Sequence, residues 1–258
     1  MTRVIEIHPN CVMRQLRRLA AGLLLCSSAG FLVAGEELLL EADFSEPSAG
    51  APSGWVVEGT GTAEVRDGAL HLREEPDGVG MVLWSERDWP ADFRLAVDLS
   101  FNNIRGIGVI FLAARAMDGG DALRDASKRT GAYNEYISGS LSSYSLSLHR
   151  YWPDGRNNPG SNLRRNSGFH LLNQALPDPC LEAQRTYHLE FVKKGARLTL
   201  KVDGTVVHDV VDTGEHGPVL GEGKIGFRLR GDSSCVMTLD SIRLWRLASC
   251  GTADSADP

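Results

Sequence analysis

Hydrophobic and polar residues alternate with a period of two along most of the chain after residue 35. In residues 93–101, for example, every odd-numbered side chain is apolar, from Phe93 to Phe101. Successive side chains of a β-strand point to opposite faces of the sheet, so this alternation predicts a strand with one buried face. The same pattern predicts further strands over residues 187–191, 198–202, 224–229 and 236–245.

Turn residues separate these runs and predict how the strands are connected. Asp67-Gly68 and Asp203-Gly204 each lie between two alternating runs. Such pairs favour tight hairpins, because glycine tolerates a positive φ. Only residues 118–129 have a helical pattern, and that stretch is short. Strands that recur between turns without intervening helices predict an all-β protein, an antiparallel β-sandwich that forms one domain over residues 36–248.

Two connections are predicted to be longer than an ordinary loop, residues 113–130 and residues 152–166. Long loops on a compact sandwich are more often functional than not. The second connection is rich in Pro, Asp, Asn and Gly, which favours an ordered loop. Residues 249–258 are small and acidic, and we expect a disordered tail there.

The N-terminal residues 1–35 have the composition of a secretory signal peptide. Three arginines within residues 14–18 precede an apolar run over residues 19–32, and small residues follow it. This order predicts a leader, with Met13 as an alternative start, and export to the periplasm or the medium. The apolar run is too short for a membrane span, so no membrane contact is expected after cleavage.

The cysteines leave two questions open. Cys26 offers lipid attachment as a less favoured alternative, because the bulky Leu25 precedes it where a small residue is expected. Removal of the leader leaves Cys180, Cys235 and Cys250. An odd number permits one disulfide and one free thiol, with Cys180–Cys235 as the expected pair, and three unpaired cysteines are the alternative.

The protein is acidic overall, yet one stretch of it is cationic. The formal net charge of the chain is −6. Residues 133–170 nevertheless hold more cationic than acidic groups, namely Arg150, Arg156, Arg164, Arg165, His149 and His170 against Glu135 and Asp154. A nucleic-acid-binding protein would normally spread positive charge over a whole face. The local excess therefore predicts an acidic small ligand and no nucleic-acid partner.

Tyrosines open the cationic stretch, in residues 133–139. If this segment is extended, Tyr133 and Glu135 share one face, while Tyr136 and Ser138 share the other. A tyrosine hydroxyl near an arginine can donate or accept a proton, because the cation favours the phenolate. The alternative is that the tyrosines cover the sandwich core and keep their hydroxyls at its rim.

Residues 144–151 form the next predicted strand. Leu146 and Leu148 are expected to face the core, and Arg150, near the end of the strand, can reach either rim. Parity then places on the opposite face Ser145, Ser147, His149 and Tyr151. A row of hydroxyls and rings on one sheet face is typical of a sugar-binding surface, and a plain solvated strand face is the alternative.

Residues 162–170 are the densest polar cluster. Asn162, Arg164, Arg165 and Asn166 offer planar donors that match a carboxylate or a sulfate. His170 follows at the expected start of a strand, and its ordinary pKa makes it a proton carrier at neutral pH. A purely structural histidine is the alternative.

Residues 133–139, 146–150 and 162–171 together resemble the YesU-like family of concanavalin A-like jelly-roll proteins, which occur in bacterial polysaccharide-degradation contexts. The later segment 217–228 also resembles that family. The resemblance spans most of residues 37–247 and implies a jelly-roll fold and action on acidic plant or algal oligosaccharides. The positions that match the family's pattern are Tyr133, Glu135, Tyr136, Ser138, Arg150, Asn162, Arg164, Arg165 and His170.

Three functions fit these residues. The first is a lyase or dehydratase that acts on uronate-containing saccharides by β-elimination, which requires that the substrate carboxylate be neutralised and that a base and an acid move protons. In this mechanism Arg164, Arg165 and Asn166 neutralise the carboxylate, His170 is the base and Tyr136 is the acid. A glycoside hydrolase is the second candidate, with Glu135 as the one carboxylate in the cluster. A non-catalytic carbohydrate-binding module is the third.

We expect no cofactor and leave a structural calcium ion open. Asp118, Asp121 and Asp125 are acidic residues of one connection, but their spacing is not that of a calcium-binding loop. The expected partner is an acidic saccharide. The oligomeric state is not indicated by the sequence.

Overall fold

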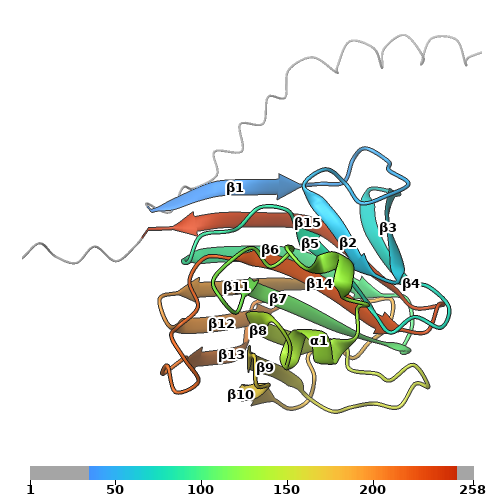
Figure 1. The fold of residues 1–258 in the computed structure, drawn as a ribbon. Helices are drawn as coiled ribbons and strands as arrows, with labels where there is room; N and C mark the ends of the chain where they lie inside the picture. The colour runs from blue at the N-terminus through green and yellow to red at the C-terminus, as the bar shows by residue number, and fades with distance from the viewer. Residues whose placement is uncertain (1–34, 249–258) are drawn as a thin grey trace, which may run out of the picture. The chain divides into compact units, whose positions relative to one another are not determined.

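The computed structural model describes residues 35–248, which fold into two sheets (Figure 1). Residues 1–34 of the predicted signal peptide, including Cys26, lie outside the described residues, as do Cys250 and the predicted tail. Within residues 35–248, no helix is both long and apolar enough to span a membrane.

Every strand pairing that forms the two sheets is antiparallel. The eight-stranded sheet has the order β13 (Thr205–Val211), β12 (Arg197–Val202), β11 (Tyr187–Lys194), β6 (Phe93–Phe101), β15 (Val236–Leu247), β4 (Ala69–Glu74), β3 (Gly61–Arg66), and β1 (Glu36–Ala42) also pairs with β15. The seven-stranded sheet has the order β10 (His170–Ala175), β9 (Ser161–Asn166), β8 (Leu141–Leu148), β7 (Gly106–Ala116), β14 (Lys224–Gly231), β5 (Met81–Ser85), β2 (Trp55–Gly59). The predicted β-sandwich is confirmed.

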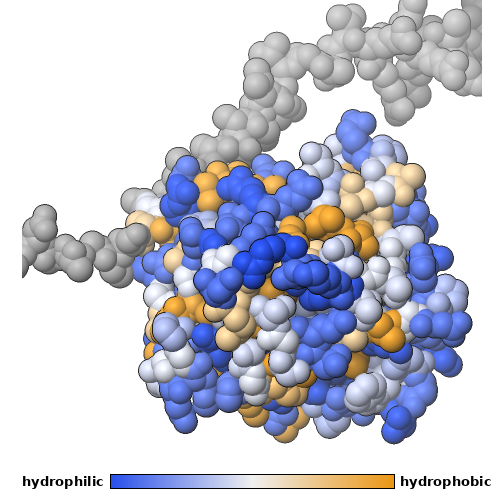
Figure 2. Space-filling model, viewed as in Figure 1, coloured by the Kyte–Doolittle hydropathy of each residue, from blue (hydrophilic) through white to orange (hydrophobic). Residues whose placement is uncertain are grey.

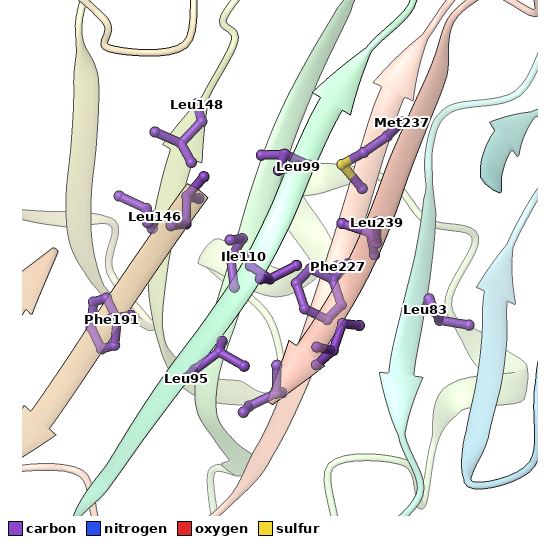
Figure 3. Close-up of a cluster of buried hydrophobic side chains, with 14 of the residues drawn as sticks. Leu83, Leu95, Leu99, Ile110, Leu146, Leu148, Phe191, Phe227, Met237 and Leu239 are labelled. Carbon is purple, nitrogen blue, oxygen red and sulfur yellow. The ribbon is translucent and has the colours of Figure 1, made fainter. Parts of the chain in front are cut away.

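One apolar core fills the space between the sheets. Leu95 and Leu239 enter it from the eight-stranded sheet, and Leu146 and Phe227 enter it from the seven-stranded sheet (Figure 3). All four side chains are almost completely buried. The period-two alternation therefore works as expected, since it places one apolar row of each strand in this layer.

Both predicted hairpins are present. The Asp67-Gly68 pair joins β3 to β4 and the Asp203-Gly204 pair joins β12 to β13, and all four residues have positive φ angles. This is the conformation that two-residue hairpin turns require.

Two other expectations were wrong. Residues 118–129 do not form an α-helix, and only a 3₁₀ turn at Ala126–Lys128 remains of that pattern. Cys180 and Cys235 do not form a disulfide, because both are buried free thiols. Burial raises the pKa of the Cys235 thiol to about 12, so this thiol stays protonated and packs as a small apolar group.

Hydrogen bonds join the two sheets along one edge of the sandwich. His208 of β13 is almost completely buried there. Its Nε2 atom lies 2.9 Å from the hydroxyl of Ser161 on β9, and its Nδ1 atom lies 2.7 Å from the Asn173 Oδ1 atom on β10. In the neutral ring, Nδ1 donates to the amide oxygen and Nε2 accepts from the hydroxyl, so both nitrogens have partners without a charge on the buried ring.

We predict that the protein loses stability below pH 6.5 through His208. Burial lowers the pKa of His208 to about 4, whereas an unfolded histidine has a pKa of about 6.5. The unfolded chain therefore binds more protons between these values, and the free energy of unfolding falls by at most about 3 kcal/mol as the pH decreases through this window. Urea unfolding at pH 7 and at pH 4.5 measures the loss.

The control is His208→Gln, which replaces the imidazole by a polar amide that cannot titrate. The buried His149 contributes equally in both proteins, so the difference between them isolates His208. An equally steep loss of stability in the variant would contradict this prediction.

Candidate functional site

The segment over residues 117–140 folds onto the outer face of the seven-stranded sheet. It contains the 3₁₀ turn and the short helix α1 (Tyr133–Ile137), which lies over that sheet (Figure 1). Tyr136 of α1 packs with Trp84 of β5 and Phe111 of β7 in a second apolar cluster beneath the segment. Residues 133–137 are therefore helical, so the two faces that an extended segment would present do not form here.

A buried ion pair fixes the segment to the sheet. The Glu58 carboxylate of β2 accepts hydrogen bonds from Arg129 Nε at 2.8 Å and from the Tyr136 hydroxyl at 2.5 Å. Burial and this carboxylate raise the pKa of Tyr136 far above its ordinary value. Tyr136 is completely buried, so the structure places it in the second apolar cluster and not on an accessible surface.

A close backbone contact sets where α1 begins. Gly131 has a φ of 93°, and a Cβ atom at this position would lie 1.9 Å from the Gly80 carbonyl oxygen. The guanidinium of Arg228, on β14, donates to the Gly131 carbonyl from Nε at 3.1 Å and from Nη2 at 2.9 Å. Only glycine fits here, and the contact places Tyr133 two residues further along.

A cleft of about 470 Å³ lies beside α1 on this face. Its lining includes the aromatic rings of Tyr133, Trp152 and Phe169, the amides of Asn158 and Asn162, and the guanidiniums of Arg150, Arg164, Arg228 and Arg230. A cleft of this volume with both polar and apolar lining residues is typical of small-ligand sites. Hydrophilic residues surround scattered hydrophobic patches on the face drawn in Figure 2.

Three of the four arginines have no carboxylate as an ion-pair partner. Arg230 is paired with the buried carboxylate of Glu74 at 2.8 Å. Arg150, Arg164 and Arg228 form no ion pair with any carboxylate of residues 35–248, and their hydrogen-bond acceptors are backbone carbonyls. Burial lowers the pKa of all three guanidiniums. The cleft is therefore cationic and can attract an anionic group.

The phenol of Tyr133 lies among these three arginines. Arg228 Cζ is 5.0 Å from the centroid of its ring, and the ring of Phe169 meets it edge-on at 5.7 Å. Burial raises the pKa of Tyr133, whereas a hydrogen bond from Ser145 and the charges of Arg228, Arg164 and Arg150 act to lower it. An ionised phenol here would thus be stabilised by four groups.

A short polar chain lies behind Tyr133 on β8 and β9. The Asn166 amide donates to the Ser145 hydroxyl oxygen at 3.0 Å and to the Ser143 hydroxyl oxygen at 3.2 Å. Because Ser145 accepts from Asn166, its own hydrogen is free to point at the Tyr133 oxygen. Asn166 is thus buried behind the cleft and contacts Tyr133 only through Ser145.

Four of the predicted substrate-binding residues line the cleft together, namely Tyr133, Arg150, Asn162 and Arg164. Ser138 does not, since its hydroxyl caps the carbonyl of Asn134 at the end of α1. His149 was also misplaced by parity. It has a φ of 49°, which ends the alternation of β8 and turns its ring inward, where it stacks on Phe101 at 4.1 Å. Burial lowers the pKa of His149.

The predicted catalytic groups do not converge. Arg164 and Arg165 are consecutive on β9 and point to opposite faces, so the Arg165 guanidinium binds Ser142 and Pro218 outside the cleft. His170 stacks on His216 with 3.7 Å between ring centroids, also outside the cleft. The Glu135 carboxylate accepts hydrogen bonds from the Thr130 and Gly131 backbone amides.

Sequence analysis missed Arg228 as a site residue. It lies 58 residues beyond the cationic stretch, on a buried strand where polar residues were not examined as ligands. The signal was the arginine at every second position of β14, Arg228 and Arg230, on the face opposite the core residue Phe227. Trp152 and Phe169 also line the cleft, although the sequence analysis gave neither of them a role in the site.

The acidic residues of the long connection are bound by protein cations. Asp118 is paired with Arg124, and Asp125 with Lys128, while the Asp121 carboxylate lies 3.3 Å from Lys224 Nζ. Within residues 35–248, no group of three or more His, Cys, Asp or Glu side chains is arranged to hold a metal ion. The calcium alternative gains no support from these contacts.

Comparison with known proteins identifies the family. Residues 37–232 match the family model described as "Domain of unknown function (DUF1961)". The uncharacterized protein YesU of Bacillus subtilis (strain 168) is 34% identical over 181 residues, which are 67% of this chain and 81% of YesU. A crystal structure of a protein of unknown function with a galectin-like fold, also from Bacillus subtilis, is 27% identical, has a TM-score of 0.71 and covers 82% of this chain and 97% of its own.

More distant structures share only the fold. SCLam, a non-specific endo-β-1,3(4)-glucanase from family GH16, is 11% identical with a TM-score of 0.57, and the match covers 83% of this chain and 92% of the glucanase. The family itself follows from the closer matches. The chain belongs to the DUF1961 family, the YesU-like family of jelly-roll proteins that its motifs resemble.

Proposed function

We propose that the protein binds a uronate-containing saccharide in the arginine cleft and cleaves it by β-elimination. The observation that carries this proposal is the phenol of Tyr133 among three arginines without carboxylate partners. The exposed rings of Trp152 and Phe169 can stack on the apolar faces of sugars, and the amide of Asn162 can bind their hydroxyls. An anionic sugar satisfies all of these groups at once.

The elimination changes three bonds at the uronate ring. A guanidinium that binds the carboxylate makes the adjacent C5 proton more acidic. The ionised phenol of Tyr133 takes that proton, the electron pair of the C5–H bond forms a C4=C5 double bond, and the C4–O bond breaks. The leaving oxygen then takes the proton from the phenol, which is thereby ionised again, so atoms and charge balance.

Hydrolysis fits the cleft less well. A glycosidase of the usual kind needs two carboxyl groups across the scissile bond, roughly 5–9.5 Å apart. Within residues 35–248, no Asp or Glu lines the cleft. Glu135 caps a turn and Glu74 is held by Arg230, so neither of these carboxylates is available to a substrate.

We predict that uronate oligosaccharides acquire a conjugated double bond when incubated with the protein, seen as increasing ultraviolet absorbance. Tyr133→Phe removes the group that moves the proton and keeps the ring, so we expect the rate to fall by about 10²–10⁴-fold while calorimetric affinity changes little. Tyr151→Phe is the matched control, because Tyr151 donates to the Leu181 carbonyl away from the cleft.

Reducing ends that appear without absorbance would instead indicate hydrolysis. Binding without either product would leave the protein as a carbohydrate-binding module. Undiminished elimination by Tyr133→Phe would exclude Tyr133 from the chemistry.

We also predict that kcat/KM increases with pH through the neutral range. The phenol must be ionised to accept a proton, and burial holds the pKa of Tyr133 above its ordinary value. Ser145→Ala removes a donor to the phenolate, so the increase should move to higher pH by about one unit. Ser143→Ala is the control, since Ser143 binds the same Asn166 amide without touching Tyr133. Equal displacement of both profiles would argue against the role of Ser145.

A further inference from the structure

The three guanidiniums of the cleft that lack an ion-pair partner come from separate parts of the seven-stranded sheet. Arg228 lies on β14, Arg164 on β9, and Arg150 follows the end of β8. We infer that the ligand carries at least two anionic groups at separate positions, either two uronate carboxylates or one carboxylate and one sulfate ester. This inference rests on the proposed function and defines the substrate class more narrowly.

Sheet geometry keeps two of these arginines apart. β7 and β8 lie between β14 and β9, so the backbones of Arg228 and Arg164 are separated by three strand spacings, about 14 Å. Both side chains line the cleft. A single carboxylate forms a two-pronged contact with one guanidinium, so one carboxylate does not satisfy both.

Contacts inside the cleft agree with this separation. Arg228 Cζ lies 5.0 Å from the centroid of the Tyr133 ring, whereas Arg164 Cζ lies 3.9 Å from the centroid of the Phe169 ring. The two rings are themselves 5.7 Å apart, in an edge-on arrangement. Each guanidinium thus lies over a different aromatic ring, which gives two distinct cationic positions.

Backbone carbonyls orient each guanidinium without neutralising it. Arg228 donates to Val79 and Gly131, and Arg164 donates to Phe169 through Nη1. The Arg164 Nε atom is itself buried, so the outer nitrogens of this guanidinium are the ones that a ligand can reach. Arg150 donates to two carbonyls of the neighbouring loop through Nη1 alone. N–H groups therefore remain at each position for a ligand.

Charge balance favours more than one anion. Burial lowers the pKa of all three arginines, and none of them forms an ion pair with a carboxylate of residues 35–248. The more distant carboxylates of Asp178 and Glu74 act in the opposite direction, on the pKa of Arg150 and of Arg228 respectively. A ligand with one negative charge would leave two cations in a partly desolvated cleft. A second anionic group compensates a second arginine, so affinity should increase markedly with the second charge.

The test measures calorimetric affinity in the Tyr133→Phe variant, which is expected to bind without turnover. The ligands are a di-uronate disaccharide, the same disaccharide with one carboxylate reduced to an alcohol, the fully reduced disaccharide, and a disaccharide with one uronate and one sulfate ester. We expect either dianionic ligand to bind at least tenfold more tightly than the mono-uronate, and the neutral disaccharide to bind most weakly. Comparison of the two dianions identifies which second anion is preferred.

A second substitution assigns one charge to one arginine. Adding Arg164→Gln should reduce the affinity for the dianionic disaccharides at least tenfold, because their second anionic group loses its partner. The dianions and the mono-uronate disaccharide should then bind with similar affinity. Arg156→Gln is the matched control, because Arg156 is exposed, pairs with Asp154 and does not line the cleft. Circular dichroism checks that both variants are folded.

The outcomes separate this inference from the proposed function. If the mono-uronate binds as tightly as both dianions, the cleft still binds a uronate but the two-anion inference is wrong. If Arg156→Gln removes the preference for dianionic ligands as fully as Arg164→Gln does, the second anionic group does not bind in the cleft. If no anionic saccharide binds more tightly than the neutral one, both the inference and the proposed function fail.

Discussion

The backbone contact between Gly131 and the Gly80 carbonyl is the constraint on which the cleft depends. A Cβ atom at Gly131 has no room beside that carbonyl, so the chain can approach the sheet this closely only with glycine. The contact brings the Gly131 carbonyl onto the guanidinium of Arg228 and starts α1 directly afterwards. The position of Tyr133 follows from it, because the ion pair of Glu58 with Arg129 holds the preceding residues.

The same contacts explain how an acidic protein keeps a cationic cleft. Elsewhere in the described chain many arginines are paired with carboxylates, as Arg94 is with Glu36. In the cleft, carbonyl groups take the place of carboxylates, and they orient a guanidinium while leaving its charge in place. Local positive potential against a negative background attracts an anionic ligand to one place and keeps it from others.

The strand pattern failed as a guide at two particular places. The alternation of β8 predicts the outward row of Ser145 and Ser147 correctly, but the positive φ of His149 turns its ring into the core. Residues 133–137 form a helix and not the extended segment that an alternation of their faces would require, because Tyr136 gains a buried contact with Trp84 and the Glu58 carboxylate. Both differences depend on partners that are distant in the sequence, which a local pattern does not contain.

The sequence by itself determined the sandwich, its hairpins and the stretch that supplies most of the cleft, because alternation, Asp-Gly turns and local charge are properties of neighbouring residues. Only the tertiary structure decided which side chains meet. It separated Arg165 and His170 from Arg164, since consecutive residues of a strand face opposite ways. It also brought Arg228 from a distant strand to Tyr133, since sheet pairing joins residues that are remote along the chain.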